Sequence, residues 1–199
     1  MIINNVNDKR GILLGNAPPT NTSVGTITTN NINGAIVVLD CETGGINCLA
    51  SSPSFNNNDF SNGVSNHMWN QLLNDDFNPL LNRSIAGLYS PGSTYKLVTA
   101  LFALERMNLN KNKTFFCNGH ISFGNRKFHC WKKEGHGYVN LHEAIEKSCD
   151  CYFYNLAKTV KIDDLAKFSN LFSYGQRTGI DIPNELKGIM PDRKWKITN

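Results

Sequence analysis

The order of the secondary-structure signals constrains the fold of this chain more than any other feature. Two runs typical of β-strands come first, at residues 35–39 and 46–50, and the turn sequence Glu-Thr-Gly-Gly lies between them at residues 42–45. This arrangement predicts a β-hairpin. The longer helical patterns follow the hairpin, and strands that precede a block of helices indicate an α+β domain. A chain of 199 residues has room for one such domain, or for a piece of a larger one.

Helical periodicity is clearest from Ser93 onward. Apolar residues recur there at spacings of three and four positions, namely Leu97, Ala100, Leu101 and Leu104. Asn140 and Glu143 have the spacing of a capping box, which predicts a short helix that ends near Lys147. The other expectations are helices at residues 68–73, 152–160 and 163–172, the last closed by Gly175, an extended segment at 178–183, and irregular structure at 106–138.

The first 33 residues are rich in Asn and Thr and poor in apolar residues. We expect them to be loop or disordered, with no assigned role, and residues 34–199 to form the folded part. The chain has no signal-peptide core and no apolar stretch long enough to span a membrane, so any targeting or anchoring segment is expected elsewhere. The net charge is +4 and the basic residues are scattered, which argues against a nucleic-acid partner.

Ser93 and Lys96 follow Pro91-Gly92 at the start of the predicted helix. Residues three apart are neighbours on one helix face, and a helix start offers free N–H groups that stabilise an oxyanion. A lysine removed from water has a lowered pKa and can act as a base toward a nearby hydroxyl. The pair therefore predicts a serine nucleophile with a lysine base, although both residues are also common at ordinary helix starts.

Ser148-Cys149-Asp150 interrupts two predicted helices 55 positions after Ser93. Alternate residues of an extended or tightly turned backbone point the same way. We therefore expect Ser148 and Asp150 to share one side, with Cys149 on the other. Ser148 can then relay a proton between Lys96 and a leaving amine, and Asp150 can bind the substrate or Lys96. The alternative is a helix-capping role for Ser148 or Asp150.

Cysteine and histidine are concentrated in the middle of the chain, where four of the five histidines lie between residues 120 and 142. The spacing Cys117-x12-Cys130-x5-His136-x12-Cys149 offers three thiolates and one imidazole, which is a closed structural zinc set. Disulfide pairing and buried apolar thiols are the alternatives. The further candidates are His120 and His129 as spare ligands, and Cys41, Cys48 and Cys151 as packed thiols, of which Cys41 and Cys48 flank the hairpin.

Several stretches resemble one enzyme family. Ser-x-x-Lys followed by Ser-x-Asp forms the first two-thirds of the signature of the penicillin-recognising serine enzymes, which ends in Lys-Thr-Gly. The segments NGAIVVLDCETGGINCLASSPSFN, LNRSIAGLYSPGSTYK and SYGQRTGIDIPNELKGIMP are similar, in order, to the class B penicillin-binding proteins. The sequence WKKEGHG at residues 131–137 and Asp150 are typical of the penicillin-binding protein 2 group within that class. The resemblance spans residues 34–195.

This resemblance implies a transpeptidase fold of the penicillin-binding-protein and β-lactamase type, with a helical subdomain and part of an antiparallel sheet. The implied reaction is peptidoglycan cross-linking during cell elongation. Ser93 would attack the D-Ala-D-Ala carbonyl of a stem peptide, and β-lactams would acylate the same serine. Lys96 would be the base, Ser148 the proton relay, and Asp150 would replace the usual Asn. The implied setting is the periplasmic face of the bacterial inner membrane, beside a glycosyltransferase and other membrane proteins of elongation.

The resemblance also favours zinc, because several members of the group carry acidic, Cys and His zinc ligands at the places of Cys117, Cys130, His136 and Cys149. A metal on Cys149 would hold the turn from behind while Ser148 and Asp150 face the reaction site. This brace is a hypothesis for how the metal would support the reaction site.

The sequence departs from the family pattern in one respect. It contains no Lys-Thr-Gly, and Lys158-Thr159-Val160 is no substitute, because it falls in a helical pattern and has Val where the family has Gly. We therefore expect a domain that is incomplete at its C-terminal side, with an inactive fragment as one alternative. A β-lactam sensor or a class D β-lactamase is the other, although both usually have an apolar residue at the place of Asp150.

Overall fold

The computed structural model describes residues 33–61 and 63–199, which form two compact units. One unit contains the described residues up to Leu88 together with Ile180–Leu186, and the other contains Tyr89–Gly179 together with Lys187–Asn199. The loop or disorder expected for residues 1–33 falls almost entirely outside the described residues. Within the described part, no helix has both the length and the apolar character needed to cross a membrane.

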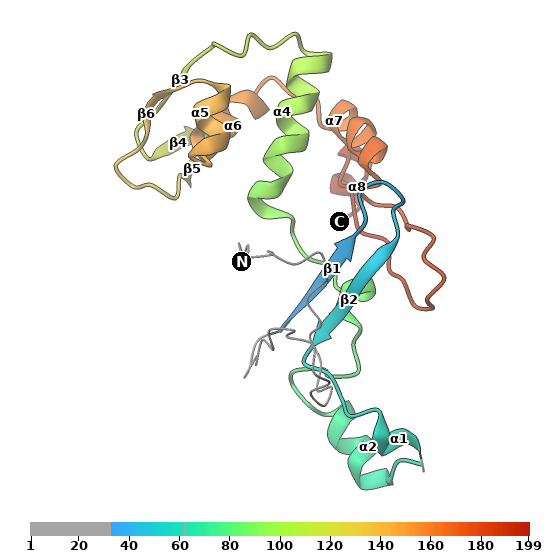
Figure 1. The fold of residues 1–199 in the computed structure, drawn as a ribbon. Helices are drawn as coiled ribbons and strands as arrows, with labels where there is room; N and C mark the ends of the chain where they lie inside the picture. Colours follow the sequence, from blue (N-terminus) through green and yellow to red (C-terminus); the bar gives the residue numbers. More distant parts are fainter. Residues whose placement is uncertain (1–32, 62) are drawn as a thin grey trace, which may run out of the picture. The chain divides into compact units, whose positions relative to one another are not determined.

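The first unit is built on the predicted hairpin (Figure 1). Its elements are β1 (Gly34–Leu39), β2 (Ile46–Ser52), α1 (Asn58–Ser61), α2 (Asn66–Leu73) and α3 (Arg83–Ala86). The strands pair antiparallel, and the turn is closed by Asp40, whose Oδ1 accepts hydrogen bonds from the backbone and the hydroxyl of Thr43, both at 2.8 Å. These bonds, first of all the one from the Thr43 backbone, lower the pKa of Asp40. A local side chain thus fixes the hairpin.

The second unit carries most of the helices and two small sheets. Its elements are the 3₁₀ turn η1 (Gly92–Thr94), α4 (Tyr95–Arg106), β3 (Phe115–Cys117), β4 (His120–Phe123), β5 (Arg126–His129), β6 (Gly137–Val139), α5 (Leu141–Glu146), α6 (Asp150–Ala157), α7 (Ile162–Ser169), the 3₁₀ turn η2 (Asn170–Phe172) and α8 (Arg193–Thr198). β3 pairs with β6 and β4 pairs with β5, both antiparallel. Figure 1 shows α5 and α6 beside these strands.

Two apolar clusters hold the second unit together. The larger cluster joins α4, α5 and α6 to the strands, with Tyr152 and Ala103 fully buried at its centre. The smaller cluster joins α4 to α7 through Phe102 and Phe168, whose rings meet at 5.5 Å. Because α4 contributes to both clusters, it is the helix around which this unit is organised.

The α+β architecture predicted from the sequence is confirmed, and so is the capping box, in which Asn140 and Glu143 bond each other's backbone N–H. The prediction of irregular structure at 106–138 was wrong, because four short strands lie there. Their three or four residues are too few to give a periodic signal. The α8 helix was not predicted, and residues 178–183 form no strand, since the chain bends at Asp181.

The helix predicted from Ser93 onward is confirmed as α4, and most of the residues whose spacing predicted it, namely Leu97, Leu101 and Leu104, are exposed. The buried positions are Val98, Ala100, Phe102 and Ala103. Cys41 was expected to pack, but it is exposed in the hairpin turn, where no side of the chain is covered. Cys48 and Cys151 are buried as expected.

Candidate active site and cysteine–histidine cluster

Ser93 lies in the 3₁₀ turn η1, just before α4. Gly92 supplies the positive φ of +58° with which the chain enters this turn, and Thr94 closes it by donating its hydroxyl to the carbonyl of Pro91 at 2.6 Å. Tyr95, the first residue of α4, shares a 2.7 Å hydrogen bond with the hydroxyl of Ser169 on α7. The bonds from Thr94 and Tyr95 therefore fix the start of α4, and with it the positions of Ser93 and Lys96.

Ser148 lies between α5 and α6 with a φ of +48°, a conformation that residues with side chains rarely adopt. The N–H of Cys149 donates to the carbonyl of Ala144 at 2.8 Å, which closes the end of α5. Asp150 is then the first residue of α6. This tight turn places Ser148 and Asp150 on one side and Cys149 on the other, as the alternation argument predicted.

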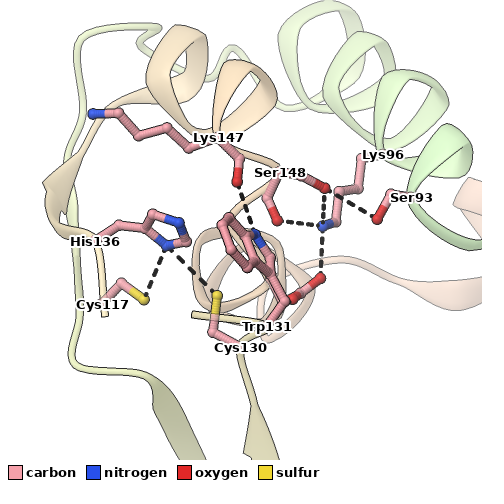
Figure 2. A network of polar contacts seen from close by, with 9 residues as sticks. Ser93, Lys96, Cys117, Cys130, Trp131, His136, Lys147 and Ser148 are labelled. Atoms are coloured by element: carbon pink, nitrogen blue, oxygen red, sulfur yellow. Dashed lines mark hydrogen bonds and ion pairs between the residues drawn. The ribbon is translucent and has the colours of Figure 1, made fainter. Parts of the chain in front are cut away.

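Lys96 connects the two predicted motifs (Figure 2). Its Nζ lies 2.6 Å from Oδ1 of Asp150, 3.0 Å from Oγ of Ser148 and 2.8 Å from the carbonyl oxygen of Ser148. The side chains of Lys96 and Asp150 retain 13% and 20% of their exposure, so this ion pair is largely shielded from water. Shielding strengthens the attraction between the two charges relative to a surface pair.

The hydroxyl of Ser148 also donates to Oγ of Ser93 at 3.1 Å. A continuous chain of hydrogen bonds therefore runs from Lys96 through Ser148 to Ser93. Since hydroxyl groups both donate and accept, the same chain can carry a proton from Ser93 toward Lys96. The sequence interpretation expected Ser148 between Lys96 and a leaving amine. The structure places it between Lys96 and Ser93.

Trp131 also contacts this network, and sequence reasoning did not include it among the site residues. Its backbone N–H donates to Oδ2 of Asp150 at 3.1 Å, and its indole Nε1–H donates to the carbonyl of Lys147 at 2.9 Å. Its ring meets the ring of His136 edge to face at 5.4 Å. The only available signal was its place in the WKKEGHG stretch, which was used for the resemblance alone.

The four predicted metal ligands lie together next to the Ser148 turn. The ligand atoms of Cys117, Cys130, His136 and Cys149 are all within 4.8 Å of one another. Nδ1 of His136 is 3.6 Å from the sulfur atoms of both Cys117 and Cys130. The three cysteines of this group are buried, and the structure forms no disulfide bond among them.

The spare histidines lie outside this cluster. His120 and His129 face each other across β4 and β5, with ring centres 6.0 Å apart. Cys151 is buried, and burial raises the pKa of its thiol. Neither histidine belongs to the group of converging ligand atoms, and nor does Cys151.

Two thiols of the cluster have pKa values that are shifted in opposite directions. Burial raises the pKa of the Cys117 thiol, but hydrogen bonds from Gly119 and His136 outweigh it and bring the pKa to about 6. Burial raises the pKa of Cys149 to about 12, and the neighbouring charge on Cys117 acts in the same direction.

Two glycines allow the loops that carry the ligands to approach each other. A Cβ on Gly135 would lie 2.1 Å from the carbonyl oxygen of Cys117, and a Cβ on Gly119 would lie 1.9 Å from the carbonyl oxygen of Lys133. Both glycines have positive φ, at +81° and +91°. The backbone contact that brings His136 to Cys117 is therefore possible only with glycine at these places.

The arrangement can perform acyl transfer. It presents a serine hydroxyl, a lysine within proton-transfer reach through a second hydroxyl, and a carboxylate that orients the lysine. The cysteine–histidine cluster is directly behind the turn that supplies two of these groups, since Cys149 lies between Ser148 and Asp150.

The comparisons with known proteins agree with this chemistry. The family model "Penicillin binding protein transpeptidase domain" matches residues 34–199. The "Peptidoglycan D,D-transpeptidase MrdA" of Acinetobacter baumannii is 42% identical to this chain over 166 residues. That match covers 82% of this chain and 25% of the relative, so the chain spans about a quarter of the relative's length.

Solved structures match over a similar range. A chain of the complex between penicillin-binding protein 2 and MreC from Helicobacter pylori has a TM-score of 0.80 and 42% identity, covering 84% of this chain and 31% of that one. A chain of a peptidoglycan synthase complex, described for the coordination of polymerization and crosslinking, has a TM-score of 0.74 and 35% identity, covering 83% and 29%.

Proposed function

Because this chain belongs to the penicillin-binding protein transpeptidase domain family, we propose that it supplies the nucleophile of a D,D-transpeptidase that cross-links peptidoglycan during cell elongation. The observation that carries this proposal is the hydrogen-bonded chain from Lys96 through Ser148 to Ser93. The substrate class is the stem peptide that ends in D-Ala-D-Ala. The similarity to a peptidoglycan D,D-transpeptidase over most of this chain supports the same assignment.

Acylation begins when Oγ of Ser93 attacks the carbonyl carbon between the two D-alanines. The hydroxyl proton of Ser93 passes to Ser148, which gives its own proton to Nζ of Lys96, the general base of this step. The proton then returns through Ser148 to the leaving nitrogen, and the C–N bond breaks. One D-Ala departs, and the peptide remains joined to Ser93 as an ester.

Deacylation repeats these steps in the reverse direction. The side-chain amine of a neighbouring stem peptide attacks the ester carbon and loses a proton to Lys96. The bond between the carbonyl carbon and Oγ of Ser93 breaks, and Ser93 regains a proton through Ser148. The products are a cross-linked peptide and the free serine. A β-lactam ring opens at Ser93 by the same first step and leaves an ester that persists.

Asp150 orients the base in this proposal. It lies 2.6 Å from Nζ of Lys96 through Oδ1, while Oδ2 is held by the N–H of Trp131. A carboxylate fixed at both oxygens keeps Lys96 directed at Ser148. This explains why an acidic residue can stand where the family usually has Asn.

We further propose that Cys117, Cys130, His136 and Cys149 hold a structural zinc ion. Their buried, converging thiols and imidazole fit the donor set that zinc prefers, and four protein ligands leave no open position for catalysis. When bound, the ion would stabilise the loops and brace the Ser148 turn through Cys149. It takes no part in the acyl-transfer steps.

The partners and location follow from the proposed reaction. Its substrate lies outside the cytoplasmic membrane, so we propose that the site faces the periplasm at the inner membrane. The Helicobacter pylori relative was solved with MreC, and another relative was solved within a peptidoglycan synthase complex. These two structures support MreC and the other components of a peptidoglycan synthase complex as partners of this chain.

The direct test is the intact mass of the protein after incubation with a penicillin, with Ser93→Ala as the control. We expect a mass gain of one ligand that is absent in the control. No gain in the unmodified protein would contradict the proposed function, and rapid turnover of the penicillin would identify a hydrolase instead. Zinc is tested separately by the metal-to-protein ratio of the purified protein.

A further inference from the structure

We propose that Trp131 is a positioning residue that clamps the Ser148 turn, so that the hydroxyl of Ser148 reaches Lys96 and Ser93 together. This inference rests on the proposed function, since it assigns Trp131 a role in the same reaction. Trp131 is not expected to exchange a proton or to bond with the substrate in this role.

The clamp consists of two hydrogen bonds on opposite sides of the turn. The indole Nε1–H bonds the carbonyl of Lys147, the residue before Ser148, at 2.9 Å. The backbone N–H bonds Oδ2 of Asp150, the second residue after Ser148, at 3.1 Å. One residue therefore holds the turn at its beginning and at its end. Figure 2 shows the bond from the indole to the carbonyl of Lys147.

The turn requires such support because its conformation is unfavourable. Ser148 has a φ of +48°, and a non-glycine residue held in this region costs about 1–3 kcal/mol. Strained backbone persists where the surroundings over-determine it. The contacts that fix this turn include the bonds from the N–H groups of Ser148 and Cys149 back to α5, the bonds from Lys96, and the two bonds from Trp131.

Trp131 is itself held by the cysteine–histidine cluster. It follows Cys130 directly, and its ring packs on His136 at 5.4 Å. Figure 2 shows its indole between the cluster and the Ser93, Lys96 and Ser148 side chains. The cluster is therefore connected to the turn through Trp131 as well as through Cys149. Because Trp131 follows Cys130 directly, the position of Cys130 determines the position of the Trp131 N–H that bonds Asp150.

The competing role is substrate contact, because the Trp131 side chain is 66% exposed. The two roles predict different kinetics. A clamp affects the rate at which the bound β-lactam acylates Ser93, whereas a substrate contact affects the affinity of the non-covalent complex. Measuring both constants separates them.

The test compares Trp131→Phe with the unmodified protein and with Trp195→Phe. The phenylalanine keeps an aromatic ring near His136 and keeps the backbone N–H, but it removes the indole donor. Trp195 on α8 is a matched control, because among the described residues its indole has no hydrogen bond to the site. Acylation by a fluorescent penicillin is followed by stopped flow over a range of concentrations, and zinc content is measured for each protein.

We expect Trp131→Phe to lower the first-order acylation rate constant two- to tenfold, which corresponds to the loss of about one hydrogen bond. The dissociation constant of the initial complex and the zinc content should stay unchanged, and Trp195→Phe should match the unmodified protein. An unchanged acylation rate would overturn the clamp. A weaker initial complex at constant acylation rate, or a slower reaction that simply follows lost zinc, would overturn it as well.

Hydrogen exchange provides a readout that does not depend on activity. We expect the amides of residues 148–150 to exchange faster in Trp131→Phe than in Trp195→Phe, while the melting temperatures of the two variants agree. If the unmodified protein is not acylated, the proposed function fails, and exchange still decides the clamp. If acylation occurs but exchange and rate are both unchanged in Trp131→Phe, only the clamp fails.

Discussion

Gly135 is the position where a single added methyl group should disrupt the cysteine–histidine cluster. An ideal Cβ there would lie 2.1 Å from the carbonyl oxygen of Cys117 and 2.6 Å from Cα of Asn118. Ordinary contact is 3.4–4 Å, so the two segments would have to separate by more than 1 Å. Both obstructing atoms belong to the backbone, and neither can rotate away as a flexible side chain would.

The chain provides a matched control for this substitution. Gly124 in the turn between β4 and β5 also has a positive φ, at +57°, but nothing lies within 4 Å of its added Cβ. Gly124→Ala should therefore cost only the left-handed strain of about 1–2 kcal/mol. Gly135→Ala carries a similar strain plus an overpacking cost of about 1–3 kcal/mol, so its expected total is about 2–5 kcal/mol.

The assay has two parts. Urea unfolding followed by circular dichroism gives the free energy of unfolding, and elemental analysis gives the zinc-to-protein ratio. We expect Gly135→Ala to lose at least 1 kcal/mol more than Gly124→Ala, an excess on the order of the overpacking cost, and to lose zinc, because His136 follows directly and must move with it. Equal losses of stability in the two variants, with zinc retained in both, would refute the argument from close backbone approach.

Three further predictions address the site and its support. Cys117→Ser should lower zinc content and acylation rate together, and an unchanged rate after zinc is lost would refute the brace through Cys149. Lys96→Met should slow acylation by about 10²–10⁴-fold, the usual contribution of a general base, with zinc content unchanged as the control. Glu143→Gln should alter the pH dependence of stability. The Asn140 backbone lowers the pKa of Glu143, so its contribution is present above the unfolded pKa and is lost as the pH falls through the folded value. The difference in melting temperature between this variant and the unmodified protein should therefore vanish in acid, and a constant difference would contradict it.

Elements that depend on nearby residues could be predicted from the sequence. The hairpin turn is fixed by Asp40 and Thr43, which are three positions apart. The start of α5 is fixed by Asn140 and Glu143, which have the same separation. The strands β3 and β6 were missed because each is three residues long and finds its partner some twenty positions away. Their formation depends on packing that no local pattern records.

The candidate residues of the site could be identified from the sequence. The spacing of Ser93 and Lys96 follows from helix geometry, and the alternation at residues 148–150 predicted which side chains would share a side. The family resemblance and the spacing of the cysteines and histidine predicted which side chains converge. These are Cys117, Cys130, His136 and Cys149.

The contacts among these groups depend on the packing of the folded chain. The bond from Ser148 to Ser93 joins residues 55 positions apart, and the bonds from Lys96 span 52 and 54 positions. The role of Trp131 depends on a carbonyl and a carboxylate at distances of 16 and 19 positions. Sequence patterns report interactions among neighbours along the chain, whereas these contacts exist because α4, α5 and α6 pack around one apolar core and bring distant polar groups to the same place.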